Sequence, residues 1–395
     1  MSRGQFLRNA AVGASVVGAS MMGMSGVAHA ALQPSDFAGW NVGILRHNTA
    51  DAAEAAGQTQ LCLDMAGVYH SSIYMMTQNN TSAGFTGAQY LVAQGCNAIL
   101  GVCTSSQGKG VANYLVSIGS SMPYVECYAT ADSINKAFDP TGYEFFYRTV
   151  APASVWAKAN APLVAPENVT LPMYVYTAPA DVYGIDFLAG WKTIFPSPQT
   201  GELNINAPAQ MPPVGDCVVV FGNPTFTNIS HVLDSLRSRT DVKQIIVAGS
   251  QRNALLLGGY TIVGNLKYDP RIIGAQPWYV EESPAYQKWY SVSGLTVAPK
   301  WDKTPRAWDA AFLMTAGLYR TPPGANLEVD SIINMASSPP GSTIYPNEFY
   351  KLPKLNAAAD TMNYEGASGP CDMLNGECKS VPFLVFPEDY IIWSQ

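Results

Sequence analysis

Short apolar runs that predict buried strands alternate along this chain with segments of helical periodicity. A first series of strands is expected at residues 41–45, 69–75, 98–102 and 123–126, with helices at 52–65, 84–93 and 111–118. A second series has strands at 173–176, 217–221 and 244–248, with helices at 183–194 and 228–237. Strands that alternate with helices form a parallel sheet covered on both faces. The sequence therefore predicts an α/β protein with two doubly wound, Rossmann-like units.

The length of the chain agrees with two units, because 395 residues exceed what one hydrophobic core usually organises. Residues 148–152 form a plausible crossover between the two series. The proline-rich segments 196–213 and 339–353 are expected to be surface excursions, since the strand-helix alternation resumes after each.

The first 30 residues have the features of an export signal. Arg3 and Arg8 precede a small apolar stretch, and Ala28-His29-Ala30 offers the small-x-small pattern that signal peptidase cuts. We expect residues 1–30 to be removed and the protein to reach the periplasm. Gly4 stands where a twin-arginine signal would have its second arginine, so the general (Sec) and twin-arginine pathways both remain open. An uncleaved membrane anchor is disfavoured, because the stretch is short and rich in small residues.

The charge of the chain argues against nucleic acid as a partner. Loss of the leader removes two arginines and no acid, which changes the formal charge from −7 to −9, and no run of Lys or Arg occurs elsewhere. A surface that neutralises phosphates needs such clusters. No later segment is apolar enough to span a bilayer.

Seven cysteines in an exported chain suggest disulfides. The best pair is Cys371 and Cys378, because a four-residue loop from Met373 to Gly376 would place them opposite each other. A two-residue loop centred on Asn375-Gly376 would not. For the other cysteines, bridges of Cys62 with Cys96 or of Cys103 with Cys127 and a set of buried thiols that includes Cys217 remain alternatives.

Polar residues follow the expected strands where a parallel sheet places its ligand crevice. These strand-end segments are 46–49, 101–110, 127–130, 177–184, 222–225 and 249–253. The segment Gly101–Gly110 carries glycines, hydroxyls and one lysine, but its spacing does not match a phosphate-binding P-loop. A weaker anion-binding role remains open for its hydroxyls and for the amides of the helix start that follows.

Catalysis is disfavoured by the same sequence. Only His47, His70 and His231 remain after export, and no metal-ligand or nucleophile pattern accompanies them. We therefore expect no enzyme activity, no metal and no cofactor.

Four short motifs occur in an order typical of one protein family. They are Asp181-Val182-Tyr183-Gly184, Gly274-Ala275-Gln276-Pro277, Ala307-Trp308-Asp309-Ala310-Ala311 and Tyr364-Glu365-Gly366-Ala367-Ser368-Gly369-Pro370. With them, the chain resembles the type I periplasmic solute-binding proteins of the leucine/isoleucine/valine-binding group, the receptors of ABC importers. The resemblance runs from about Trp40 to the C-terminus.

The resemblance implies two Rossmann-like lobes joined by three crossovers, with a ligand cleft between them that closes by a hinge motion. Lobe one would comprise residues 38–150 and 277–365, and lobe two would comprise residues 151–276 and 366–395.

The resemblance also implies the positions of a binding site. In amino-acid-binding members, hydroxyls and amides of two lobe-one loops hold the solute's carboxylate, and the matching residues here are Thr104, Ser105, Tyr128, Ala129 and Thr130, all neutral donors. A turn-capping role for the hydroxyls of Thr104 and Ser105 is the alternative.

Lobe two would add Tyr183 and Asn223, and Trp278 or Tyr279 of a crossover would add an aromatic face. The family's acid for the solute's ammonium group is replaced by Gln251, and Ala153 stands where an aspartate can occur. Amides, aromatic or other carboxylates, or a divergent amino-acid-like solute therefore fit better than an ordinary amino acid.

The leading hypothesis is a monomeric periplasmic receptor that delivers a small solute to an ABC permease in the inner membrane. A sensor of the same fold that signals to a chemoreceptor or kinase is the first alternative. An exported enzyme on two Rossmann-like lobes is the second.

Overall fold

The computed structural model describes residues 34–120, 122–138, 146–178, 180–206, 209–222, 226–248, 269–299, 302–321, 361–362, 364–370, 372–374, 377–380, 382–386 and 390–393. Among these residues, no helix has both the length and the apolar character needed to cross a membrane.

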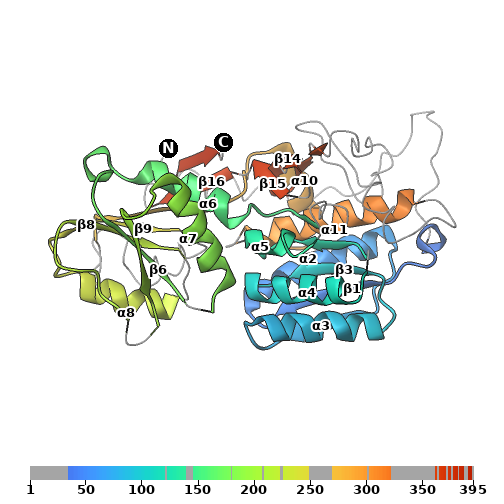
Figure 1. Cartoon of the computed structure of the whole chain (residues 1–395). Helices are drawn as coiled ribbons and strands as arrows, with labels where there is room; N and C mark the ends of the chain where they lie inside the picture. Colours follow the sequence, from blue (N-terminus) through green and yellow to red (C-terminus); the bar gives the residue numbers. More distant parts are fainter. Residues whose placement is uncertain are drawn as a thin grey trace. The chain divides into compact units, whose positions relative to one another are not determined.

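The first sheet contains five parallel strands in the order β2-β1-β3-β4-β5. The strands are β1 (Val42–His47), β2 (Ser72–Met76), β3 (Ala98–Val102), β4 (Tyr124–Glu126) and β5 (Phe146–Arg148). The helices around them are α2 (Ala50–Ala66), α3 (Thr81–Ala93), α4 (Ser105–Ser117), the short α5 (Asp132–Asn135) and α11 (Lys303–Arg320). Helices α3 and α4 cover one face and α2 and α11 the other (Figure 1).

The second sheet has seven strands in the order β17-β16-β10-β9-β8-β6-β7. Its parallel strands are β6 (Met173–Thr177), β7 (Thr200–Asn204), β8 (Cys217–Phe221), β9 (Val242–Val247) and β10 (Ile272–Pro277). Strands β16 (Pro382–Phe386) and β17 (Tyr390–Trp393) are antiparallel additions from the end of the chain. Its helices are α6 (Ala153–Asn160), α7 (Val182–Ile194) and α8 (Phe226–Leu236), and α10 (Pro284–Val292) follows β10.

Smaller elements complete the described chain. They are the 3₁₀ turns Pro34–Phe37, Ala161–Leu163 and Pro166–Asn168, and the short strands β11 (Thr361–Met362), β12 (Glu365–Gly366), β13 (Gly369–Pro370), β14 (Asp372–Leu374) and β15 (Glu377–Ser380).

The two parallel sheets confirm the α/β fold class that the sequence predicts. One expectation is wrong: segment 196–213 is not only a surface excursion, because it contains β7, which pairs with β6 at the sheet edge.

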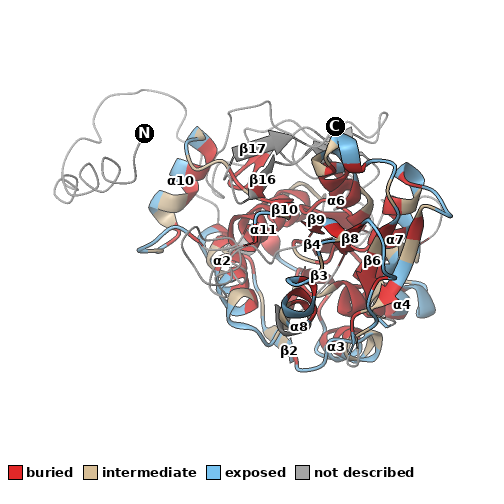
Figure 2. Ribbon diagram, turned by 90° about the vertical axis from the view of Figure 1, so that its left-hand side faces the viewer, coloured by how far each residue is buried: buried red, intermediate tan, exposed pale blue. Residues whose placement is uncertain are grey.

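The central strands of both sheets are buried on both faces, as continuous apolar strands require, whereas the edge strands β2 and β7 are partly exposed. Along β8, Val218 and Val220 pack in the apolar cluster of α6 and α7, whereas Val219 and Phe221 pack in the cluster that contains α8 side chains. Strand β8 is accordingly buried along its length (Figure 2).

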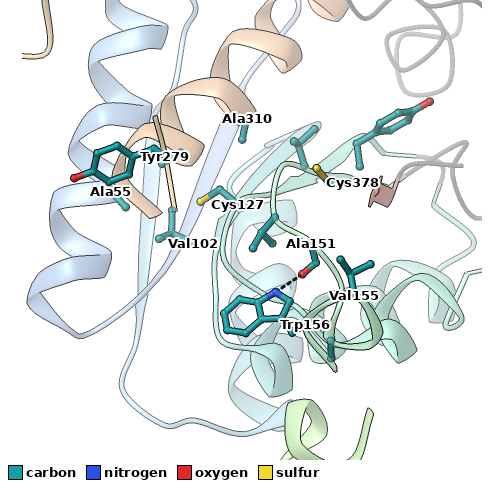
Figure 3. Packing of buried hydrophobic residues seen from close by; sticks show 14 of the residues in the cluster. Ala55, Val102, Cys127, Ala151, Val155, Trp156, Tyr279, Ala310 and Cys378 are labelled. Carbon is teal, nitrogen blue, oxygen red and sulfur yellow. Dashed lines mark hydrogen bonds between the residues drawn. The ribbon is translucent and has the colours of Figure 1, made fainter. Parts of the chain in front are cut away.

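The crossover from the first sheet to the second is packed into the larger apolar cluster. The Trp156 indole N–H donates to the Ala151 carbonyl at 2.9 Å, and the ring lies in one cluster with Val102, Cys127 and Val155 (Figure 3). This packing places α6 directly after the crossover.

Helix α4 begins at Ser105, six residues earlier than the expected start at residue 111. The segment Gly101–Gly110 is therefore mostly helix and not an open loop. Its glycines permit close contact with α3, because a Cβ on Gly110 would lie 2.0 Å from the Thr81 carbonyl oxygen. A Cβ on Gly84 of α3 would lie 1.8 Å from the Gln107 carbonyl oxygen.

The hairpin near the C-terminus has a different register from the expected one. Leu374 pairs with Glu377 and Met373 pairs with Cys378, so two residues and not four separate the strands. Cys378 is therefore opposite Met373 and not Cys371. Cys371 lies outside the described residues, so its bridge to Cys378 stays a prediction without that geometric support. The structure places Cys62, Cys96, Cys103, Cys127 and Cys217 as buried thiols.

Two Gly→Ala substitutions in helices should have opposite effects on stability. Gly110→Ala should lower the free energy of unfolding by about 3 kcal/mol, because its methyl group meets the backbone of α3. Gly57→Ala lies in the exposed middle of α2 with open space around it and should raise the free energy by about 1 kcal/mol. Urea unfolding measures both. Equal effects of the two substitutions would contradict the close helix contact.

Candidate ligand-binding site

Thr104 is the N-cap of α4 at the end of β3. Its side-chain oxygen accepts the Gln107 amide and the Gln107 side chain accepts the Thr104 amide at 3.0 Å, which forms a capping box. The Thr104 hydroxyl also donates to Asn79. The hydroxyl of Thr104 therefore has the capping role that was considered as the alternative. Its side chain is half-buried at the end of β3.

Ser105 and Thr130 are brought together. The buried Ser105 Oγ accepts the amides of Thr130 at 3.0 Å and of Ala131 at 3.1 Å, and lies 3.4 Å from Thr130 Oγ1. Ser105 therefore joins the start of α4 to the loop after β4.

The amides of Tyr128 and Ala129, expected to hold a solute, have an internal acceptor. Both donate to Oε1 of Glu126, at 2.9 and 3.2 Å. Glu126 is the last residue of β4 and is fully buried. The sequence analysis did not identify this role of Glu126, because a single glutamate at the end of a short strand has no distinctive spacing.

Beside the Tyr128 ring lies an ion pair of the buried Lys303 and the half-buried Asp51, which the sequence did not predict. Lys303, at the start of α11, contacts Asp51 of α2, and its Nζ lies 3.6 Å from the centroid of the Tyr128 ring. Burial would lower the pKa of Lys303, but Tyr128 and Asp51 raise it above its usual value. Tyr128 is therefore held by a cation on one face and remains half-buried.

Tyr183 lies in the first turn of α7, after β6. Asp181 caps this helix by accepting the Gly184 amide at 2.8 Å. The Tyr183 ring packs edge-on against Trp156, with centroids 5.5 Å apart. The side chain is 7% exposed, and its hydroxyl is buried without a hydrogen-bond partner among the described residues.

The remaining expected residues divide into two groups. Trp278 is half-buried and stacks on Tyr279 with centroids 4.9 Å apart, whereas Tyr279 is fully buried, so Trp278 is the accessible one. Asn223 and Gln251 lie outside the described residues.

Helix α7 contacts the first-sheet helices α4 and α5. Asp186 of α7 accepts the Ser133 amide of α5 at 2.8 Å. The helix that carries Tyr183 is therefore adjacent to the segment that follows Thr130.

Three buried charged residues hold the connecting segments. Arg148 binds both carboxylate oxygens of Glu377, at 2.6 and 2.7 Å. Arg306 donates to the carbonyls of Thr149 at 2.7 Å and of Trp278 at 3.0 Å. These contacts join segments that are far apart in sequence, so spacing alone could not reveal them.

Asp309 of the Ala307–Ala311 motif holds the Tyr364–Pro370 motif. Its carboxylate accepts the amides of Ala367 and Ser368, both at 2.8 Å, and the Ser368 hydroxyl at 2.6 Å. A Cβ on Gly366 would lie 2.4 Å from this carboxylate, which explains the glycine. Burial raises the pKa of Asp309 to about 6.

A basic hollow on the second sheet is not a candidate site. It is lined by Arg237, Arg239, Thr240, Asp269, Pro270 and Arg271. Arg271 binds Asp269 and three carbonyls, and Arg239 binds Asp241 and two carbonyls, so these guanidinium groups are engaged by the protein itself.

No family model and no curated protein sequence matches this chain. Its structure is similar to that of the leucine-binding protein LivK from Thermotoga maritima, with a TM-score of 0.64 and 13% identity over 90% of this chain and 98% of that one. It is also similar to the structure of an ABC-transporter solute-binding protein from Rhodopseudomonas palustris in complex with p-hydroxybenzoic acid. The TM-score is 0.62, with 13% identity over 90% of this chain and 97% of that one. A third similar structure is that of an amino acid ABC-transporter substrate-binding protein from Pseudomonas fluorescens. Its TM-score is 0.61, with 13% identity over 88% of this chain and 89% of that one.

These likenesses define the class of fold. The chain has the type I periplasmic binding protein fold, which the sequence motifs had indicated. Because the identities are low, the ligand has to be argued from the residues of this chain.

The pKa of Asp309 predicts a pH dependence of stability. Folding raises this pKa from about 4 to about 6, so the native state binds more protons than the unfolded chain between these values. The contribution of Asp309 to stability is therefore greatest below about pH 4 and is lost as the pH rises through about 6, a change of about 3 kcal/mol.

Urea unfolding of the wild type and Asp309→Asn at about pH 4 and about pH 7 isolates this effect. The wild type should lose about 2–3 kcal/mol more than the variant between the two conditions. If the free energy of unfolding changed equally with pH in the wild type and in Asp309→Asn, the raised pKa of Asp309 would be contradicted.

Proposed function

We propose that this protein is a periplasmic receptor of an ABC importer that captures a small organic solute and presents it to an inner-membrane permease. The similarity of about nine-tenths of the chain to solute-binding proteins supports this proposal. Those neighbours are named as binding proteins, and we propose binding rather than catalysis here as well. The receptor would act as an exported monomer.

The observation that carries the proposal is the Tyr183 hydroxyl. A buried hydroxyl without a partner destabilises a protein by about 1–3 kcal/mol, so its presence calls for a compensating role. A solute that accepts or donates one hydrogen bond would satisfy this hydroxyl. Its position after a parallel strand is where open α/β sheets bind ligands.

The proposed site combines side chains from both sheets. Thr104 and Thr130 offer hydroxyls, Tyr128 and Trp278 offer aromatic faces, and Tyr183 offers the unpaired hydroxyl. Ser105 and Ala129 would support these residues through the loop contacts described above, and Asn223 and Gln251 would complete the set. The lobes proposed for closure are residues 38–150 with 277–365, and residues 151–276 with 366–395.

The solute proposed for this set is small and organic. One neighbour was solved with leucine and another with 4-hydroxybenzoate. Amides, aromatic or other carboxylates, and divergent amino-acid-like compounds are accordingly the first candidates for this chain. A thermal-shift screen of these classes and of sugars tests the proposal, because a ligand at a hundred times its dissociation constant adds ~2.7 kcal/mol to stability.

Tyr183→Phe should separate binding from folding. Because the hydroxyl has no partner among the residues that the structure describes, its removal should leave the stability of the free protein unchanged or raise it by about 1 kcal/mol. The affinity for the solute found in the screen should fall about tenfold. Thermal unfolding and isothermal titration calorimetry measure the two quantities.

Tyr286→Phe is the matched control, since Tyr286 is a buried tyrosine of α10 outside the proposed site. It should leave solute affinity unaltered. An unchanged affinity in Tyr183→Phe, or an equal loss in both variants, would argue against the site.

A further inference from the structure

The Glu126 carboxylate lies among converging hydrogen-bond donors at the end of the first sheet. Its Oε1 accepts four backbone amides, those of Cys103 at 3.2 Å, Cys127 at 3.1 Å, Tyr128 at 2.9 Å and Ala129 at 3.2 Å. Oε2 accepts the Tyr124 hydroxyl at 2.7 Å. Converging amides of this kind form the usual cradle of an anionic ligand, and here the anion is part of the chain.

The surrounding structure is shaped to this carboxylate. An added Cβ on Gly101 of the neighbouring strand β3 would lie 2.1 Å from Oε2, so only glycine leaves room for it. Glu126 is fully buried and forms no ion pair within the described part of the chain. Its charge is therefore balanced by hydrogen-bond donors and not by a cation.

The remaining backbone amides of the same loop also donate to a side chain of the protein. The amides of Thr130 and Ala131 donate to Ser105 Oγ, which leaves every amide from residue 127 to residue 131 bonded to a side chain of the protein. A solute carboxylate at this loop would meet no free backbone donor. It would also lose its own hydration near a buried negative charge.

We propose that Glu126 is a specificity-determining residue that makes this receptor select solutes with a neutral group, a carboxamide or a hydroxyl, at the first-sheet end and reject carboxylates there. This inference rests on the proposed receptor function and narrows its solute class. The hydroxyls of Thr104, Tyr128 and Thr130 suit such a group, because each can both donate and accept.

Matched pairs of solutes test the selectivity. 4-Hydroxybenzamide and 4-hydroxybenzoate, benzamide and benzoate, and leucinamide and leucine are titrated into the wild-type protein, and every other hit of the screen is compared with its carboxamide or carboxylate counterpart. We expect the neutral member to bind at least tenfold more tightly, since like charges a few ångströms apart repel by several times the ~1.4 kcal/mol of a tenfold change. Tighter binding of the carboxylates by the wild type would overturn the proposal.

Glu126→Gln removes the charge and preserves the shape. Its side-chain oxygen still accepts the four amides and its NH₂ can donate to the Tyr124 oxygen, so the fold should be retained. The disadvantage of the carboxylate member should shrink at least tenfold. Tyr124→Phe is the control, because it removes a donor to Glu126 without removing the charge and should keep the preference for neutral solutes. An unchanged preference in Glu126→Gln would overturn the proposal.

A solute-independent measurement tests the anion cradle by itself. Glu126→Ala should have a lowered melting temperature that formate raises more than chloride at the same ionic strength, whereas the wild type should respond equally to both salts. Absence of a formate effect would show that the amides do not form an anion cradle and would overturn the proposal. If Glu126→Ala does not fold, the solute titrations of the wild type and of Glu126→Gln still test the proposed selectivity.

The two proposals fail in different ways. If no compound of the screen raises the melting temperature, the receptor function fails and the selectivity falls with it, even where formate restores Glu126→Ala. If solutes bind and carboxylates are preferred, the receptor function stands and only the role of Glu126 fails.

Discussion

Backbone amides that are buried beyond the ends of strands must find an acceptor inside the protein, and at three places in this structure the acceptor is a side-chain carboxylate. Glu126 accepts the amides after β4, and Asp309 accepts the amides of Ala367 and Ser368. Asp132 accepts the Ser154 amide at 2.9 Å, at the start of α6. Each carboxylate replaces water for groups that would otherwise be unsatisfied. The paths of the chain at the sheet ends depend on these contacts.

Arginines provide the complementary contacts to carbonyl oxygens. Arg148 reaches the carbonyls of Ala129 and Ala131, and Arg306 reaches those of Thr149 and Trp278. Removal of either partner from a buried pair such as Arg148 and Glu377 leaves an uncompensated charge, which makes such pairs determinants of geometry more than of net stability. Among the described residues, the hydroxyls of Tyr183 and Tyr286 are both buried without a hydrogen-bond partner, and only Tyr183 lies directly after a parallel strand, where α/β sheets bind solutes.

Strands could be predicted from sequence more accurately than the helix starts and the site. The bounds of β3 and β8 match the expected runs, because a continuous apolar strand buried on both faces has a strong local signal. The start of α4 could not be predicted in this way. Its glycines lower helix propensity, and the compensating contact with the backbone of α3 is a tertiary effect.

The positions of Thr104, Tyr128 and Tyr183 at strand ends could be predicted, since parallel topology alone places them there. Their hydrogen-bond states could not. Lys303 meets Asp51 across a separation of 252 residues in sequence, and Glu126 is recognised only when the amides around it are seen to converge.

The net charge at the end of the first sheet depends on which of its ionisable side chains are paired with an opposite charge. Burial would raise the pKa of Asp51, but Lys303 beside it lowers that pKa below its usual value, so the two groups form an ion pair with no net charge. Within the described part of the chain Glu126 pairs with no cation. Burial raises the pKa of Glu126 above its usual value, and the N–H and O–H donors around its carboxylate act in the opposite direction by stabilising the ionised form. An ionised Glu126 therefore adds one negative charge at this place, and backbone and hydroxyl dipoles compensate it instead of a cation. A neutral solute avoids both the repulsion by an ionised Glu126 and the shortage of free backbone donors, and the charge of the Lys303 cation is already balanced by Asp51.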